Sequence, residues 1–275
     1  MSSNLEPTPV TMEEAAFLRA YDMERYPRPS VAVDVVALTI VHGRFGVLLS
    51  RRTEPPARGS FGLPGTFVQL DETLEAAAVR ALAVKTGLTD IFLEQLYTFG
   101  TPGRDPRGRV ISVAYYALVP GGEMAIRGRP PEGSAFAWVR VPFEGETPAP
   151  VSVYNASGEL ALAFDHASII GTAIARLRGK LWYAPVAFEF VLPEFTLLDL
   201  LYVYQTILGH PLNKNSFRRR ITASGLIGPV GRTRDGLKAR PAELFRFLGR
   251  DTDLLSELSD QPDDPDFLSR SDPEA

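Results

Sequence analysis

Cysteine is absent from the 275-residue sequence, and histidine occurs only three times. Without cysteine there can be no disulfide, no thiolate nucleophile and no cysteine-ligated zinc, and three scattered histidines argue against a histidine-based metal centre. No apolar run approaches the roughly 20 residues of a membrane-spanning helix. The first residues are polar and acidic, unlike a secretory signal. We therefore expect a cytoplasmic protein without membrane association, metal or cofactor.

The composition is typical of a globular protein, with 45% hydrophobic and 23% charged residues. A length of 275 residues suits one large domain or two ordinary ones, since domains usually have about 100–150 residues. A change of composition at Ala184 and Pro185 indicates a boundary. We expect a helical extension over residues 1–29, a first domain over 30–184, a second domain over 185–250 and a tail over 251–275.

The net charge of −4 hides two regions of opposite sign. Residues 251–275 carry nine acidic residues against Arg270, which gives −8 and leaves +4 for residues 1–250. We expect this acidic tail to be disordered. Between residues 209 and 250 ten basic residues face only Asp235 and Glu243. A basic segment of this kind usually faces a polyanion.

Patterns of apolar residues predict the elements of the first domain. β-Branched residues dominate residues 31–41 and 45–52, which predicts a hairpin that turns at His42 and Gly43. Apolar residues at helical spacing after Thr73 predict a helix that Gly87 ends. The other predicted elements are helices over 11–26 and 160–183, strands over 110–120 and 135–141, and a turn-rich segment over 55–65.

The second domain has the pattern of a winged helix-turn-helix. An amphipathic helix over 195–209 is followed by a shorter basic helix from Asn213 to Gly225 and then by a basic hairpin over 226–248. Phe217 and Ile221 mark the buried face of the basic helix. The candidate DNA contacts are Lys214, Asn215, Arg218 and Arg219 on the helix, which can read bases, and Arg232, Arg234 and Lys238 in the hairpin, which suit phosphates.

The stretch TFVQLDETLEAAAVRALAVKTGL, residues 66–88, resembles the Nudix box, whose pattern runs from a glycine through a glutamate to an arginine and three further glutamates. With the box arginine on Arg80, the first glutamate is Glu72 and the leading glycine is replaced by Thr66. The three later glutamates are replaced by Ala81, Val84 and Lys85, at spacings that share one helix face. Family members gather carboxylates around a divalent metal there, so we expect this helix to hold no metal and the domain to have no catalytic residue.

Further segments extend the resemblance to the NrtR-type transcription regulators. These segments are LEQLYTFGTPGRDPRGRVISVAYYALVP, LAFDHASII, RLRGKLWY and LPEFTLLDLLYVYQTILGHPLNKNSFRRRI, and the resemblance covers about Tyr26 to Leu248. It implies an α/β fold, a Nudix-like α/β/α sandwich with a mixed sheet, followed by a winged helix. It also implies a repressor, usually a dimer on a palindromic operator, that senses ADP-ribose or a related nucleotide and then releases DNA. Relatives act in NAD metabolism and sugar catabolism.

Basic residues near the box are the candidate ligand contacts, because guanidinium groups pair well with phosphate oxygens. Phe67, and Tyr97 or Phe99, are candidates to stack on an adenine, with a place in the core as the alternative. We expect Asp165 and His166 to have a structural role as a helix cap. For Arg80 the alternative to a ligand contact is a purely structural role. The basic candidates are Arg51, Arg52, Arg80, Lys85, Arg104, Arg107 and Arg109.

Two other functions stay open on the sequence. A diverged ADP-ribose pyrophosphatase is the first, because Asp71, Glu72, Glu75 and Glu94 stand near the box and are possible relocated metal ligands. An RNA-associated module is the second, but the basic segment lacks the aromatic platform expected for single strands. The leading hypothesis is the ligand-responsive repressor.

Overall fold

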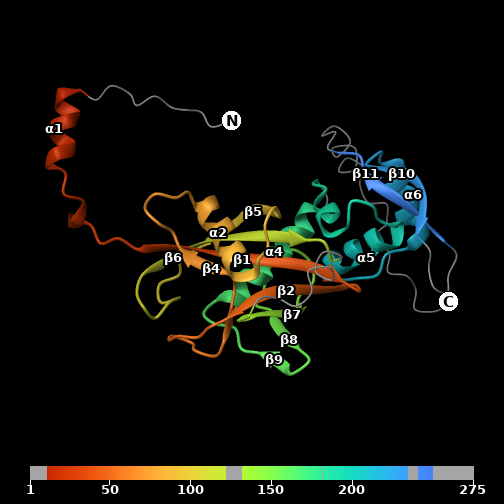
Figure 1. The fold of residues 1–275 in the computed structure, drawn as a ribbon, viewed down its shortest axis with the longest axis horizontal. Helices are drawn as coiled ribbons and strands as arrows, with labels where there is room; N and C mark the ends of the chain where they lie inside the picture. The colour runs from red at the N-terminus through yellow and green to blue at the C-terminus, as the bar shows by residue number, and fades with distance from the viewer. Residues whose placement is uncertain (1–10, 122–131, 182, 235–240, 250–275) are drawn as a thin grey trace.

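The computed structural model describes residues 11–121, 132–181, 183–234 and 241–249 (Figure 1). Lys238 and the acidic tail of residues 251–275 lie outside the described residues. None of the described helices is both long and apolar enough to cross a membrane.

A mixed sheet forms the first part of the molecule, as the resemblance implied. Its strands follow the order β5-β6-β1-β2-β7-β8-β9, with β3 paired to β2 and β4 paired to β1. Strand β1 is parallel to β6 and antiparallel to β2. The strands are β1 (Ser30–Val41), β2 (Arg44–Arg51), β3 (Phe61–Gly62), β4 (Gly65–Phe67), β5 (Phe92–Phe99), β6 (Val110–Val119), β7 (Ser134–Arg140), β8 (Ser152–Asn155) and β9 (Gly158–Leu160).

The predicted hairpin is confirmed. His42 and Gly43 both have positive φ, of 50° and 70°, and connect Val41 of β1 to its partner Arg44 of β2. A two-residue turn with two positive φ values matches the right-handed twist of the flanking strands.

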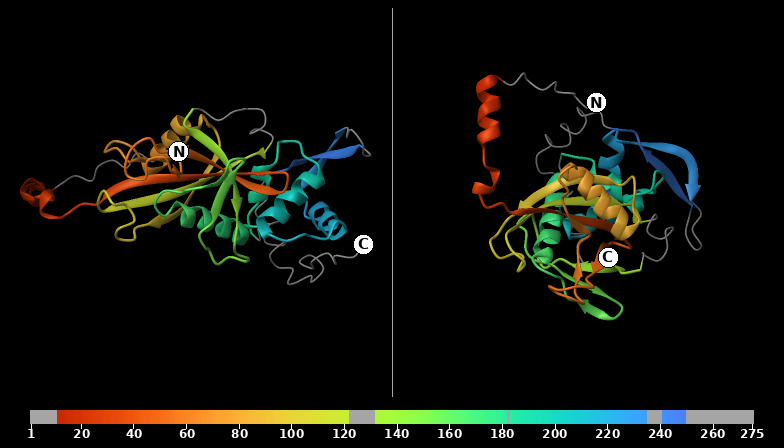
Figure 2. Two further views of the ribbon diagram at one scale, coloured as in Figure 1. Left: turned by 90° about the horizontal axis from the view of Figure 1, so that it is seen from below. Right: turned by 60° about the vertical axis from the view of Figure 1, so that its left-hand side comes forward.

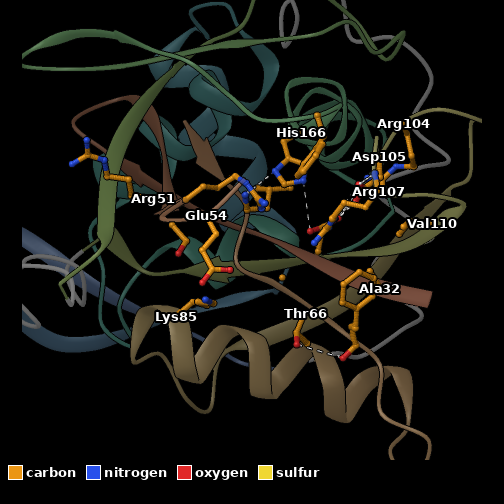
Figure 3. A pocket seen from close by; sticks show the side chains of 18 of the residues that line it. Ala32, Arg51, Glu54, Thr66, Lys85, Arg104, Asp105, Arg107, Val110 and His166 are labelled. Atoms are coloured by element: carbon orange, nitrogen blue, oxygen red, sulfur yellow. Dashed lines mark hydrogen bonds and ion pairs between the residues drawn. The ribbon is translucent and has the colours of Figure 1, made fainter. Parts of the chain in front are cut away.

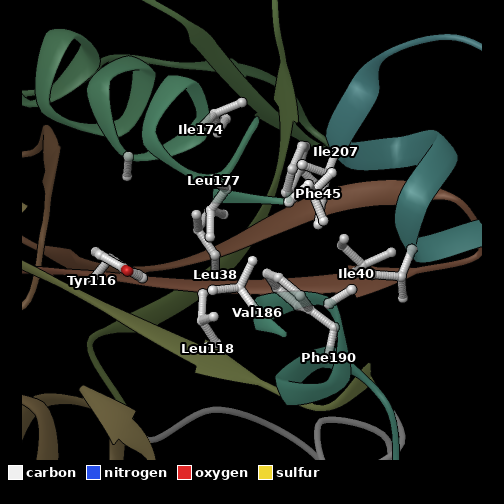
Figure 4. Close-up of a cluster of buried hydrophobic side chains, with 14 of the residues drawn as sticks. Leu38, Ile40, Phe45, Tyr116, Leu118, Ile174, Leu177, Val186, Phe190 and Ile207 are labelled. Carbon is white, nitrogen blue, oxygen red and sulfur yellow. The ribbon is translucent and has the colours of Figure 1, made fainter. Parts of the chain in front are cut away.

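Two helices cover opposite faces of the sheet and make it a sandwich. Residues of β1 alternate between the faces: Val33 and Val35 pack with helix α2 (Leu74–Thr86), while Val36 and Leu38 belong to the core that contains helix α4 (His166–Lys180). Figure 4 shows Leu38 beneath Ile174 and Leu177 of α4. Helix α2 begins at the cap Thr73 and ends at Gly87, which has φ 71°, as predicted.

The winged helix pattern is confirmed in the C-terminal part. Its elements are η2 (Val186–Phe190), α5 (Leu197–Leu208), α6 (Lys214–Ala223), β10 (Ile227–Arg234) and β11 (Ala242–Phe247), and the two strands pair antiparallel. The Asn213 side chain accepts hydrogen bonds from the backbone N–H groups of Asn215 and Ser216, so it caps α6 at the residue where the basic helix was expected to begin. This part packs at the hairpin end of β1 and β2 (Figures 1 and 2).

Several elements differ from the prediction. The helix expected over 160–183 begins only at His166, because residues 158–160 form β9. The helix expected over 11–26 is divided into α1 (Met12–Ala20) and the short 3₁₀ helix η1 (Met23–Arg25). Helix α1 has no buried residue and stands away from the sheet (Figure 2). The turn-rich segment contains β3 and ends where β4 begins.

Helix α4 contains two glycines with different surroundings. A methyl group at Gly171 would overlap the backbone carbonyl oxygen of Ala149. A methyl group at Gly179 would meet only the carboxylate of Glu146, at 3.0 Å, and that side chain can move. Alanine favours a helix over glycine by about 1 kcal/mol. This gain in helix propensity is the same at both positions, so a difference between the two alanine variants reports packing.

We expect Gly171→Ala to lower the free energy of unfolding by about 1–3 kcal/mol, because a rigid backbone group opposes the new methyl. Gly179→Ala is the matched control in the same helix and should leave stability unchanged or raise it. Urea unfolding of both variants checks this. A Gly171→Ala variant as stable as Gly179→Ala would show that α4 is not held against the segment at Ala149.

Candidate ligand site and nucleic-acid interface

A polar cavity of about 300 Å³ opens beside strands β1 to β4 (Figure 3). Arg104, Arg107 and His166 lie on one side of it, and Arg51, Glu54 and Lys85 on the other. The full lining consists of Ala32, Asp34, Ser50, Arg51, Arg52, Thr53, Glu54, Gly62, Leu63, Gly65, Thr66, Phe67, Lys85, Arg104, Asp105, Arg107, Val110, Phe164 and His166.

The charge of the lining is predominantly positive. The basic residues are Arg51, Arg52, Lys85, Arg104 and Arg107, and the acidic residues are Asp34, Glu54 and Asp105. The structure thus brings together most of the ligand contacts expected from the sequence, including Phe67. An excess of cations in a concave site suits an anionic ligand such as a phosphate ester.

Arg80 and Arg109 belong to the expected set, but neither lines the cavity. The Arg80 guanidinium donates to the Glu72 carboxylate, with Nε 3.0 Å from Oε2, and also to the Thr66 hydroxyl and the Phe67 carbonyl oxygen. The hydrogen bond from Arg80 lowers the pKa of Glu72. Arg80 therefore ties α2 to β4, and Arg109 donates to the carbonyl oxygen of Gly100.

A buried ion-pair cluster forms one wall of the cavity. Arg104, whose side chain is 5% exposed, donates from Nε and a terminal nitrogen to both oxygens of Asp165, at 2.9 and 2.6 Å. Asp34 lies 3.6 Å from Arg104 and accepts from the Ser112 hydroxyl. Burial lowers the pKa of Arg104, but its hydrogen bond to Asp165 and the nearby carboxylates outweigh burial and raise it. Asp165 stands at the N-cap position of α4, as expected, but its side chain makes no cap hydrogen bond and instead anchors Arg104.

His166 is buried at the first turn of α4 and is held as a neutral ring. Its Nδ1 accepts the backbone N–H of Leu63 at 2.9 Å, so the proton is on Nε2, which lies 3.7 Å from an Asp34 oxygen. Burial lowers the pKa of His166, against the opposing effect of Asp34. The histidine fixes the start of α4 against the loop that follows β3.

Phe164 is a site residue that the sequence reasoning missed. Two cations lie over its ring, with the Arg52 guanidinium 4.8 Å and the Arg107 guanidinium 5.8 Å from the ring centroid. Arg107 also lies 5.2 Å from the ring of Phe67. Phe164 has φ 54°, a strained value for a bulky residue, and such strain is found at functional sites. The segment LAFDH carries no local signal of this conformation.

The three altered box positions do not share one environment. Ala81 is 2% exposed and belongs to the core between α2 and the sheet, whereas Val84 is 74% exposed. Lys85 lines the cavity. The three positions have the expected helical spacing within α2, but only Lys85 reaches the cavity. Within the part of the chain that the structure describes, no group of three His, Asp or Glu residues is arranged to hold a metal ion.

Helix α6 presents a basic surface to solvent. Phe217 and Ile221 are buried, as predicted, and the expected outward residues Lys214, Asn215, Arg218 and Arg219 are all exposed. In the hairpin, Arg232 pairs with Glu194, and Arg234 lies 2.8 Å from Asp199 at the start of α5. A phosphate would have to compete with these carboxylates for the two hairpin arginines.

Comparisons with known proteins agree with these two parts of the structure. The NUDIX domain model matches residues 28–144, and the NrtR DNA-binding winged helix domain model matches residues 187–247. The chain is 35% identical over 243 residues to the ADPR responsive transcriptional repressor NtrR of Acinetobacter baylyi, covering 88% of this chain and 91% of that protein. It is also 35% identical over 145 residues to the ADP-ribose pyrophosphatase of Methanocaldococcus jannaschii, covering 53% and 73%.

Solved structures extend the match. The Shewanella oneidensis NrtR complexed with a 27mer DNA superposes with a TM-score of 0.64 at 30% identity, covering 82% of this chain and 95% of that chain. The fold and cavity thus define a Nudix domain joined to a winged helix. The chain belongs to the NrtR family of transcriptional regulators.

The buried ring of His166 should make stability depend on pH. Because burial lowers its pKa in the folded protein, the unfolded chain binds a proton more readily below about pH 6.5. The stability that neutral His166 contributes is therefore present above that pH and is lost as the pH falls toward the lowered folded value, by at most about 1.4 kcal/mol per unit.

Urea unfolding between about pH 5 and 7.5 tests this effect. The parental protein should lose more stability on acidification than His166→Gln, whose side-chain carbonyl can still accept the Leu63 N–H. His210→Gln, on a partly exposed loop, is the control and should follow the parental protein. Equal losses in the parental protein and His166→Gln would contradict the buried neutral ring.

Proposed function

We propose that this chain is a ligand-responsive DNA-binding transcriptional repressor that binds ADP-ribose or a related nucleotide and then releases operator DNA. The observation that carries this proposal is the presence, in one chain, of a cavity lined by cations and an exposed basic helix in a winged helix fold. The relative from Acinetobacter baylyi that matches both parts is described as an ADPR responsive repressor. We assign ligand sensing to residues 30–184 and DNA binding to residues 185–250.

The cavity suits a nucleotide diphosphate in size and charge. A volume of about 300 Å³ is at the lower end of the range for small-molecule sites. Arg51, Arg52, Lys85 and Arg107 are the cations that we assign to the diphosphate. Arg107 also pairs with Asp105, at 2.7 Å, but its side chain is 44% exposed, whereas that of Arg104 is 5% exposed and pairs with Asp165. Phe67, which is partly exposed in the lining, offers a ring face to the adenine.

A sensor gains from binding its signal without hydrolysing it. At the box positions Ala81 and Val84 bring no carboxylate, and Lys85 brings positive charge to the place where family enzymes hold metal. Glu72 forms an ion pair with Arg80. We infer that Lys85 supplies part of the charge that a divalent ion brings to the diphosphate in those enzymes.

We expect no appreciable Mg²⁺-dependent hydrolysis of ADP-ribose by the purified protein, because the helix face that organises metal and water lacks its acids. Release of AMP, measured by chromatography, should stay at background. Robust Mg²⁺-dependent release of AMP that is abolished by Glu72→Gln would favour the alternative, a diverged ADP-ribose pyrophosphatase.

The basic helix and the hairpin should contribute differently to DNA binding. We assign base contacts to α6 and phosphate contacts to Arg232 and Arg234, with a homodimer placing two α6 helices on a palindromic operator. Arg218→Ala should weaken binding to the cognate site by about 1–3 kcal/mol if its guanidinium makes a bidentate contact with a base.

Arg232→Ala should weaken cognate and random DNA alike and reduce the salt dependence, because phosphate contacts release counterions without reading sequence. Glu194→Gln is its counterpart: it removes the carboxylate that competes for Arg232 and should strengthen binding to both DNAs. Fluorescence anisotropy at several salt concentrations measures these effects. An Arg218→Ala variant that binds its operator as tightly as the parental protein would show that α6 is not the recognition helix.

An electrophoretic mobility shift on the DNA upstream of the protein's own operon tests the proposed function. The protein should retard this fragment, and ADP-ribose should release it, whereas ribose 5-phosphate, which lacks the diphosphate and adenine, should have little effect. Retardation that ADP-ribose leaves unchanged would contradict the proposal, as would a failure to bind the fragment.

A further inference from the structure

Helix α4 begins in the wall of the cavity. His166, in its first turn, lines the cavity and accepts the N–H of Leu63, and the preceding Asp165 holds Arg104 through two hydrogen bonds. Phe164, immediately before them, contacts Arg52 and Arg107. A ligand that draws these two arginines toward a phosphate would therefore change the surroundings of the residues that fix the start of α4.

The body of α4 is packed so that it moves as a unit. Ile169, Ile170, Ile174 and Leu177 are all fully buried in the main core. Gly171 lies directly against the backbone at Ala149. A helix held on its apolar face and at a backbone contact transmits a displacement along its axis, because packed cores respond by discrete shifts and not by gradual deformation.

Arg178, in the last turn of α4, reaches the winged helix. The residue is 4% exposed, and its Nε donates to the carbonyl oxygen of Ile207 in the last turn of α5, at 2.8 Å. A terminal nitrogen donates to the carbonyl oxygens of Phe143 and Gly145, at 3.0 and 2.9 Å. The negative end of the α5 dipole favours a cation at this position.

The contact continues from α5 to the basic helix. The Tyr204 ring of α5 packs against the Phe217 ring of α6, with centroids 5.2 Å apart. Phe217 is also on the buried face of the helix whose other face carries Arg218. A shift of the C-terminal end of α5 is thus passed to α6 by side-chain packing.

We propose that Arg178 is the positioning residue that transmits occupancy of the cavity to the winged helix, by fastening the end of α4 to the end of α5. This inference rests on the proposed function, in which ligand and DNA oppose one another. A buried guanidinium with three carbonyl acceptors fixes direction as well as distance, because burial limits the access of water that could replace a lost hydrogen bond.

A second arginine of helix α4 provides a matched control for Arg178. Arg176, two residues earlier, is partly buried and donates to the carbonyl oxygen of Leu96 in β5. It makes the same kind of hydrogen bond as Arg178, but to the sheet and not to α5. Arg176→Gln should therefore have a structural effect of a similar kind without breaking the connection to the winged helix.

The experiment uses the full-length parental protein, Arg178→Gln, Arg178→Lys and Arg176→Gln. Circular dichroism and thermal melting establish folding, calorimetry gives the Kd for ADP-ribose without DNA, and anisotropy gives the Kd for the upstream duplex with and without saturating ADP-ribose. In the parental protein the ligand should weaken DNA binding by roughly 5- to 150-fold, the usual range of coupling between sites.

Arg178→Gln should bind ADP-ribose with a Kd within about twofold of the parental value. ADP-ribose should weaken its DNA binding by less than about twofold, because the hydrogen bonds between the ends of α4 and α5 are lost. Arg178→Lys keeps the charge but cannot reach all three carbonyls with a planar fork, so we expect an intermediate ligand effect. Arg176→Gln should keep the parental effect.

Folded Arg178→Gln or Arg178→Lys with the parental ligand effect would overturn the proposal. If Arg178→Gln does not fold, Arg178→Lys decides: a reduced effect with unchanged ADP-ribose affinity supports the proposal, and the full effect overturns it. An equal loss in Arg176→Gln would also overturn it, because the loss would then follow any damage to α4. Absence of a ligand effect in the parental protein would instead refute the proposed function.

Discussion

Burial of helix α4 is the constraint on which the rest of the structure depends. The helix covers one face of the mixed sheet, its first turn closes a wall of the cavity, and its last turn contacts α5. Its apolar residues fix it laterally, while its two ends carry the polar groups His166 and Arg178. A single packed helix therefore fixes both the shape of the cavity and the position of the winged helix.

Within the cavity the ionic groups have two distinct tasks. The Arg104 side chain and Asp34 are buried, Asp165 is partly buried, and Arg104 pairs with both carboxylates, so these residues hold the wall in place. Arg51, Arg52 and Lys85 lie in the lining outside this cluster, where their charge can meet a diphosphate. Charge that is fixed by the protein binds an anion without activating water, in contrast to a metal centre.

Local patterns in the sequence predicted the elements whose turn residues, cap residues and apolar spacing all lie within one short segment. The hairpin at His42, the capped helix α2, and the helices and hairpin of the winged helix have their turn and cap residues in the sequence. Strands β3, β4, β8 and β9, of two to four residues, were missed, because such short strands are defined by their pairing and not by their own residues. The eight-residue strand β5 was missed because an irregularity between Gln95 and Tyr97 breaks its alternation.

The same distinction applies to the cavity. Its basic residues were predictable from type and from the family pattern, and most of them line it. The ion pair between Arg80 and Glu72 agrees with the structural role that was the alternative for Arg80. The bond between Arg104 and Asp165 was not predicted, because these residues are 61 positions apart and meet only through the fold. Phe164 was missed because a positive φ at a phenylalanine is imposed by its surroundings.

If ligand in the cavity and DNA on the winged helix oppose one another energetically, each must weaken the binding of the other. Calorimetric titration of ADP-ribose into the protein, alone and saturated with its operator duplex, measures the coupling. The account predicts that DNA weakens ADP-ribose binding by the same factor by which ADP-ribose weakens DNA binding, roughly 5- to 150-fold. Equal affinities for ADP-ribose in the two titrations would contradict it.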